Sequence, residues 1–137
     1  MTGVVVCVVV LAVAGAFGVL QRQRNGRVRV RGRDDGKRLD AVELGGELGE
    51  RATLVQFSSA FCAPCRATRR ILGEVAGLVP GVTHVEIDAE ARLELVRELE
   101  ILKTPTVLVL DADGRVVRRA TGQPRKADVI AALGEAV

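Results

Sequence analysis

The 137-residue sequence is poor in aromatic residues, which make up 2% of it, with three Phe and neither Trp nor Tyr. Proteins that bind single-stranded nucleic acids stack bases on aromatic side chains, so this scarcity argues against a nucleic-acid-binding protein. It also leaves Val, Leu, Ile and Ala to fill the core. A chain of this length has room for one domain with one small core.

Cysteine and histidine are also scarce, with three Cys and one His. Three cysteines do not make the disulfide framework of a small secreted domain. Cys62 and Cys65 form a CxxC motif, but a zinc site would need two more ligands. Of the two candidates that remain, Cys7 and His84, Cys7 lies in an apolar amino-terminal run that would be inside a membrane. We therefore expect no metal and no other cofactor, and we expect Cys7 to pack as a small hydrophobic residue.

The net charge of +3 combines a basic segment with a slightly acidic remainder. Residues 22–38 contain eight basic and two acidic residues, whereas residues 39–137 contain twelve basic and fifteen acidic ones. Val28 and Val30 alternate with arginine, so a short extended piece is an alternative there, but three glycines within this segment favour a mobile linker. We expect a basic juxtamembrane linker at 22–38 and a folded domain at 39–137.

Residues 3–20 form an apolar run without a charged side chain. As a helix the run would measure about 27 Å, close to the thickness of a bilayer core. It predicts one transmembrane anchor at 1–21; a cleaved secretory signal is the alternative, but the usual basic start is missing. Six arginines between Arg22 and Arg33 place the following domain in the cytoplasm by the positive-inside rule, with the extracytoplasmic side as the alternative. They could also contact anionic lipid headgroups, and the alternative is a solvated basic linker that only fixes the topology.

Hydrophobic periodicity and turn signals predict alternating strands and helices after residue 39. Asp40 and Glu43 form a capping box for a short helix reaching about Leu48. Further elements are expected as strands at 53–57, 84–87, 106–110 and 115–121, and as helices at 62–79, after Asp88 and after Pro124. This order indicates an α/β fold with helices on both faces of a sheet.

The CxxC motif lies where the first of these strands runs into a helix. Cys62 would sit near the helix amino terminus, where unpaired N–H groups and the helix dipole stabilise a thiolate. Cys62 is therefore the candidate nucleophile, and Cys65 would resolve the mixed disulfide about one turn later. Pro64 suits the first helical turn because the N–H that it lacks has no partner there.

Three motifs resemble those of the thioredoxin family: Phe57 to Cys65, Thr104-Pro105-Thr106, and Asp113-Gly114 with Gly122. The resemblance covers about 39–137. It implies a thioredoxin-like fold with a central mixed sheet and thiol–disulfide exchange with protein partners. It further implies a cis peptide at Pro105 facing the Cys62 sulfur, and a substrate surface formed by five residues: Phe61, Ala63, Pro64, Thr104 and Pro105.

The sequence departs from the family at four positions. Gln56 stands where reductive thioredoxins place a buried carboxylate that moves a proton for the second cysteine, and an amide cannot titrate. His84 aligns near a family lysine beside that carboxylate, as an ordinary strand residue or as a titrating group. Phe61 replaces the usual tryptophan and Ala63 the usual glycine, which suggests a narrower or different set of partners.

These observations favour a membrane-tethered, monomeric thiol–disulfide oxidoreductase that exchanges electrons with protein disulfides and a thiol donor. Two alternatives remain open. One is a non-enzymatic, redox-responsive binding module, suggested by Gln56. The other keeps the chemistry but places it outside the membrane, like anchored thioredoxin-like proteins that serve cytochrome maturation.

Overall fold

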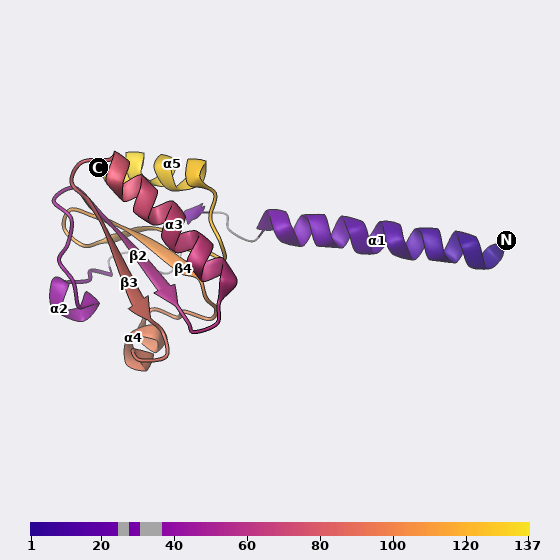
Figure 1. Ribbon diagram of the computed structural model, residues 1–137, viewed down its shortest axis with the longest axis horizontal. Helices are drawn as coiled ribbons and strands as arrows, with labels where there is room; N and C mark the ends of the chain where they lie inside the picture. Colours follow the sequence, from indigo (N-terminus) through magenta and orange to yellow (C-terminus); the bar gives the residue numbers. More distant parts are fainter. Residues whose placement is uncertain (25–27, 31–36) are drawn as a thin grey trace.

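The computed structural model describes residues 1–24, 28–30 and 37–137. A long helix, α1 (Thr2–Arg24), projects from a compact body that contains all the other elements (Figure 1). The body consists of β1 (Val28–Val30), α2 (Ala41–Leu44), β2 (Ala52–Ser58), α3 (Ala63–Leu78), β3 (Val82–Asp88), α4 (Leu93–Glu98), β4 (Thr106–Asp111), β5 (Val116–Thr121) and α5 (Lys126–Ala136).

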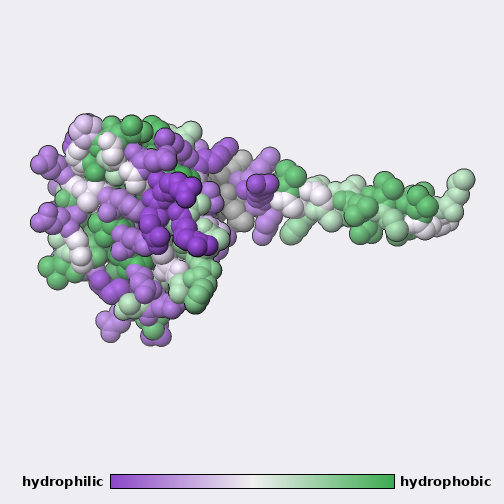
Figure 2. Space-filling model, viewed as in Figure 1, coloured by the Kyte–Doolittle hydropathy of each residue, from purple (hydrophilic) through white to green (hydrophobic). Residues whose placement is uncertain are grey.

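Helix α1 is apolar around its whole circumference and exposed along its length. The segment Thr2–Gln23 has a mean hydropathy of 2.8 and is long enough to cross a membrane. Figure 2 shows it as a mostly hydrophobic rod that touches the body only near its carboxyl end. An exposed apolar surface of this size requires lipid or another apolar surface to cover it.

The five strands form one mixed sheet in the order β1-β5-β4-β2-β3. Strands β2 and β3 are parallel, with Ser58 opposite Asp88, whereas β4 is antiparallel to both β2 and β5. The expected mixed sheet is therefore confirmed. All seven residues of β2 are buried, since this central strand has a neighbour on each side and helices above and below.

Helices cover both faces of the sheet, as the sequence predicts. Helices α3 and α5 pack on one face, where they bury Leu54, Leu72, Val75 and Leu133. Helices α2 and α4 cover the other face over Val55, Phe57, Leu95 and Leu99. The alternation of β2 side chains between these two clusters is the period of two expected for a strand buried on both faces.

The predicted capping box is confirmed: Glu43 N–H donates to Asp40 Oδ1 and Asp40 N–H donates to a Glu43 carboxylate oxygen. The helix is nevertheless shorter than expected. It ends at Leu44 instead of about Leu48, because Gly45 takes a left-handed conformation with φ of 69° and its N–H bonds back into the helix.

Asp88 does not cap a helix, which corrects a second expectation. It is the last residue of β3, and its carboxylate accepts a hydrogen bond from Glu90 N–H in the turn that follows. Helix α4 starts five residues later, at Leu93, with Arg92 as its N-cap. The parallel pairing with Ser58 extends the strand one residue beyond the apolar segment from which the prediction was made.

The segment expected as a linker without secondary structure contains a strand. Val28–Val30 forms β1 on the outer edge of β5, with Val28 opposite Ala120. The alternation of Val28, Arg29 and Val30 was the only sequence signal for it. Residues 25–27 and 31–36, on which the rest of the linker prediction falls, lie outside the described residues.

Gly114, in the turn between β4 and β5, is required by both its conformation and its surroundings. Its φ is +85°, and a Cβ there would lie 2.2 Å from the carbonyl oxygen of Leu39. Gly114 itself accepts a hydrogen bond from Leu39 N–H at 2.9 Å. The turn therefore holds the first residues of the domain against the hairpin.

We expect Gly114→Ala to lower the free energy of unfolding by about 2 kcal/mol, because it adds both left-handed strain and a backbone clash. Gly73→Ala is the matched control: this exposed helical glycine has no atom within 4 Å of the added Cβ, so stability should rise by about 0.5–1 kcal/mol. Denaturant unfolding measures both variants. Equal effects of the two substitutions would contradict this account of Gly114.

Candidate active site

The two cysteines lie where β2 delivers the chain into α3. Strand β2 ends at Ser58, a short loop follows, and Cys62 is the N-cap of α3. Its Sγ accepts a hydrogen bond from Cys65 N–H at 3.2 Å, and Pro64 lies in the first turn. The expected position at the helix amino terminus is confirmed; in general, this position favours a thiolate over a thiol.

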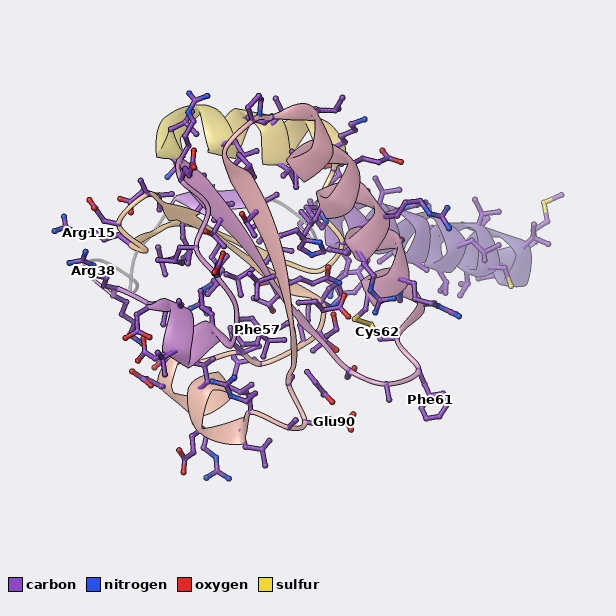
Figure 3. All side chains as sticks on the ribbon, turned by 60° about the vertical axis from the view of Figure 1, so that its left-hand side comes forward. Arg38, Phe57, Phe61, Cys62, Glu90 and Arg115 are labelled. Carbon is purple, nitrogen blue, oxygen red and sulfur yellow. A yellow bond between two sulfur atoms is a disulfide. The ribbon has the colours of Figure 1, made fainter. Side chains whose placement is uncertain are left out.

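Cys62 and Cys65 form a disulfide, with an S–S distance of 2.14 Å and a Cα–Cα distance of 5.2 Å. Figure 3 shows it at one edge of the body, at the start of α3. Cys62 is partly exposed, whereas Cys65 is 1% exposed. A partner can therefore reach the sulfur of Cys62 but not that of Cys65.

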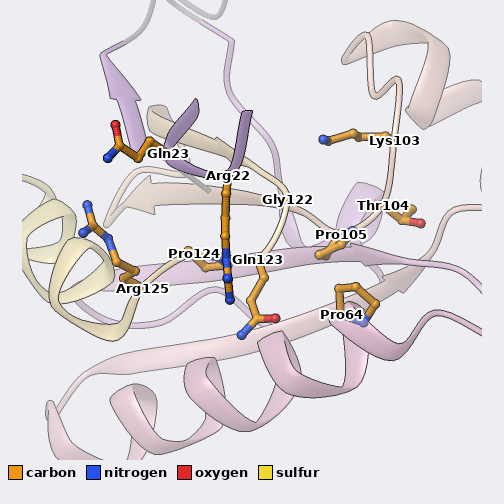
Figure 4. Close-up of a pocket in the computed structure, with 10 residues that line it drawn as sticks. All are labelled: Arg22, Gln23, Pro64, Lys103, Thr104, Pro105, Gly122, Gln123, Pro124 and Arg125. Carbon is orange, nitrogen blue, oxygen red and sulfur yellow. The ribbon is translucent and has the colours of Figure 1, made fainter. Parts of the chain in front are cut away.

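The Thr104–Pro105 peptide bond is cis, as the resemblance implies. A hydrogen bond of 2.8 Å between Ser59 Oγ and Thr104 Oγ1 ties this loop to the loop before Cys62. Pro64 and Pro105 line the same cavity, of about 580 Å³, which Figure 4 shows in close-up. The structure thus brings together two motifs that lie about 40 residues apart in the sequence.

Phe61, which precedes Cys62, is fully exposed and points away from the body in Figure 3. Its φ of +58° lies in the left-handed region, which a bulky side chain rarely adopts. Strained residues of this kind are concentrated at functional sites. An exposed aromatic ring held next to the accessible cysteine offers an apolar contact to a partner.

Gln56, at the position of the family acid, is completely buried and fully hydrogen-bonded. Its Nε2 group donates to Ser58 Oγ at 3.0 Å and to the carbonyl oxygen of Cys65 at 2.8 Å. Its Oε1 lies 3.1 Å from His84 Nε2 and accepts the hydrogen of that nitrogen. Gln56 therefore anchors the turn that carries Cys65, without a titratable group.

His84 hydrogen-bonds to Gln56, and two charged side chains lie near it. Besides Gln56, the ion pair of Arg69 with Glu86, at 2.6 Å, lies close enough to influence its titration. Burial lowers the pKa of His84 below its usual 6.5; the Glu86 carboxylate opposes this shift and the Arg69 guanidinium adds to it. The family likeness indicated the neighbourhood of His84, but the sequence did not reveal its bond to Gln56 or the bond between Ser59 and Thr104.

A lowered pKa of His84 in the folded state makes stability depend on pH. The unfolded chain binds a proton more readily, so the contribution of His84 is fully present above about pH 6.5 and is lost as pH falls below it. We expect the wild type to lose more unfolding free energy between pH 7.5 and 5.5 than His84→Gln, which keeps a donor for Gln56 but cannot titrate. Equal losses in denaturant titrations would refute this role.

Comparisons with known proteins agree with this geometry. The family model described as Thioredoxin matches residues 46–135. The thioredoxin of Mycolicibacterium smegmatis is 29% identical over 90 residues, which are 64% of this chain and 80% of that protein. The thioredoxin of Mycobacterium tuberculosis is 30% identical over 88 residues, covering 64% and 75% of the two chains.

Solved thioredoxin structures share the fold. A mutant thioredoxin from Halobacterium salinarum superposes with a TM-score of 0.58 at 17% identity, covering 64% of this chain and 75% of its own. The mitochondrial thioredoxin 3 of Saccharomyces cerevisiae gives 0.55 at 19%, covering 63% and 79%. With the family model matching more than half of the sequence, the chain belongs to the thioredoxin family and is a thiol–disulfide oxidoreductase.

Proposed function

We propose that Cys62 is the nucleophile and Cys65 the resolving cysteine of a protein disulfide reductase tethered to a membrane by α1. The observation that carries the proposal is the difference in access between the two sulfurs: Cys62 is partly exposed at the helix N-cap, and Cys65 is buried one turn behind it. Only Cys62 can meet a bulky partner.

The reaction starts from the dithiol. The Cys62 thiolate attacks one sulfur of a substrate disulfide, which forms a mixed disulfide and releases the other substrate sulfur as a thiolate that takes up a proton. The Cys65 thiolate then attacks Cys62 Sγ, and the second substrate sulfur leaves. The substrate gains two electrons and two protons, and the enzyme is left with the Cys62–Cys65 disulfide, which a thiol donor reduces.

Proton transfer at Cys65 differs from the family pattern in this proposal. Gln56 holds the Cys65 carbonyl but cannot accept a proton, so the proton of the Cys65 thiol leaves through water or through the partner. The exposed Phe61 and Ala63, with Pro64 and the Thr104–Pro105 loop, form the surface that contacts the substrate backbone.

The proposed membrane tether is supported by the length of α1 and by the basic residues at its carboxyl end. The segment Thr2–Gln23 is long enough to span a bilayer, no charged side chain precedes Arg22, and basic residues recur from Arg22 onward. Under the positive-inside rule this pattern keeps the domain, residues 39–137, in the cytoplasm. There the cysteine pair would rest reduced and donate electrons, and the domain would act as a monomer.

The exchange mechanism predicts that Cys65→Ser accumulates mixed disulfides on Cys62, because the resolving step is removed. Cell extracts quenched with acid and separated by electrophoresis without reductant should contain covalent adducts of the variant. These adducts should disappear when a thiol reductant is added. The matched control, Cys62→Ser in the Cys65→Ser background, should contain none. Absence of Cys62-dependent adducts, with the purified wild type unable to reduce a protein disulfide, would rule out the proposed roles.

Topology is tested by fusing alkaline phosphatase to the carboxyl terminus in bacterial cells. We expect no phosphatase activity, because the enzyme matures only outside the cytoplasm, and we expect fluorescence from the corresponding green fluorescent protein fusion. High phosphatase activity with no fluorescence would place the domain outside the membrane. A soluble, shortened product would instead indicate that α1 is a cleaved signal.

A further inference from the structure

Two hollows border the CxxC motif, one at the two cysteines and one at Pro64, and basic residues line both. The smaller hollow, of about 290 Å³, lies on the α3 side of Cys62, and its charged lining residues are Arg66 and Arg69. The larger cavity, of about 580 Å³, begins at Pro64 and Pro105 and extends to the carboxyl end of α1. Its charged lining residues are Arg22, Lys103 and Arg125. Among the described residues, no carboxylate lines either hollow.

Salt bridges compensate this charge only in part. Arg69 pairs with Glu86, and Arg125 pairs with Asp128 at 2.9 Å. Arg22 and Arg66 have no acidic partner among the residues whose side chains the structure describes. These two guanidinium groups, one in each hollow, remain available for charged groups of another molecule.

The cations stand out because the domain as a whole is slightly acidic, with fifteen acidic and twelve basic residues in 39–137. Acidic residues predominate around α4 instead, where Glu43, Glu90, Glu94 and Glu98 line another hollow together with one basic residue, Arg92. Figure 3 shows Glu90 below Cys62, on the side away from α3. The exposed Cys62 therefore lies between a cationic side, formed by α3 and the Pro105 loop, and an acidic side, formed by the turn after β3 and by α4.

From this arrangement we infer that the preferred substrates are protein disulfides flanked by acidic residues, and that the acidic flank binds along the cationic hollows between Arg66 and Arg22. This inference rests on the proposed function and adds its substrate class. The larger cavity opens directly beside the two prolines that border the exchange site (Figure 4), so a chain lying there is already next to Cys62.

The charges favour an acidic protein segment over a lipid headgroup as the occupant. Anionic lipid would account for Arg22, which lies at the end of the apolar helix, but not for Arg66 and Arg69 on α3, which line the other hollow beside Cys62. A substrate chain that crosses the exchange site would pass both Arg22 and the two arginines of α3. The basic side chains would then attract the acidic flank before exchange begins.

The test uses the full chain, reduced, in non-ionic detergent micelles, with two synthetic peptides that differ only in three glutamates or three lysines beside one disulfide. We expect the acidic peptide to be reduced about tenfold faster at low ionic strength, and the ratio to approach one in about 1 M salt. Because a ratio is measured, any effect of a variant on the reactivity of Cys62 itself cancels.

Arg66→Glu should lower the ratio at least about threefold, and Arg22→Glu should also lower it. Arg51→Glu is the matched control: it changes the net charge equally, but this exposed residue lies at the opposite end of β2 from Cys62. The inference is overturned if both peptides react equally fast, or if Arg51→Glu alters the ratio as much as Arg66→Glu does.

Two further outcomes separate the alternatives. If Arg22→Glu leaves the ratio unchanged and only weakens binding to phosphatidylserine vesicles, the larger cavity binds lipid at Arg22, and the inference fails for that cavity. If neither peptide is reduced by the wild type, the proposed function fails together with the inference. Equal, Cys62-dependent reduction of both peptides overturns only the inference.

Discussion

The site depends on one constraint, the passage of a fully buried central strand into the amino terminus of a long helix. Strand β2 is buried along its whole length, so the position of its last residue is fixed by packing on both faces. The loop that follows can only place Cys62 at the N-cap of α3. Accessibility of one sulfur, burial of the other and the favourable field of the helix all follow from that junction.

Gln56 links this junction to the neighbouring strand. As part of β2 it points to the α3 face, where its amide holds the Cys65 carbonyl, while His84 on β3 holds the amide from the other side. A carboxyl group in this position could take up and release a proton, but burying its ionised form would be costly. The amide keeps the hydrogen bonds and removes the titration. Gln56 thus holds the Cys65 turn by hydrogen bonds, and in the proposed mechanism it takes no part in proton transfer.

The sequence predicted the parts of the fold that depend on local pattern. The capping box at Asp40, the central strand leading to the CxxC motif and the alternation of strands and helices are all found, because apolar periodicity and turn residues determine them. The end of α2 and the start of α4 were missed, since they depend on one glycine conformation and on pairing with a distant strand. Where the structure has β1, the sequence favoured a mobile linker over an extended piece, because a strand of three residues at the edge of a sheet gives only a weak sequence pattern.

The chemistry of the site was predictable to a similar degree. The CxxC motif and the Thr104–Pro105 loop could be recognised from the sequence, but the basic lining of the two hollows could not, because Arg22, Arg66 and Lys103 come from three separate segments.

The reactivity of the two cysteines is tested most directly by the pH dependence of iodoacetamide alkylation of each cysteine in the reduced protein, followed by mass spectrometry. The account predicts that Cys62 reacts with a midpoint below about 8.5, the usual pKa of a thiol, while Cys65 stays protected. Equal alkylation of both cysteines, or a Cys62 midpoint at or above that value, would contradict it.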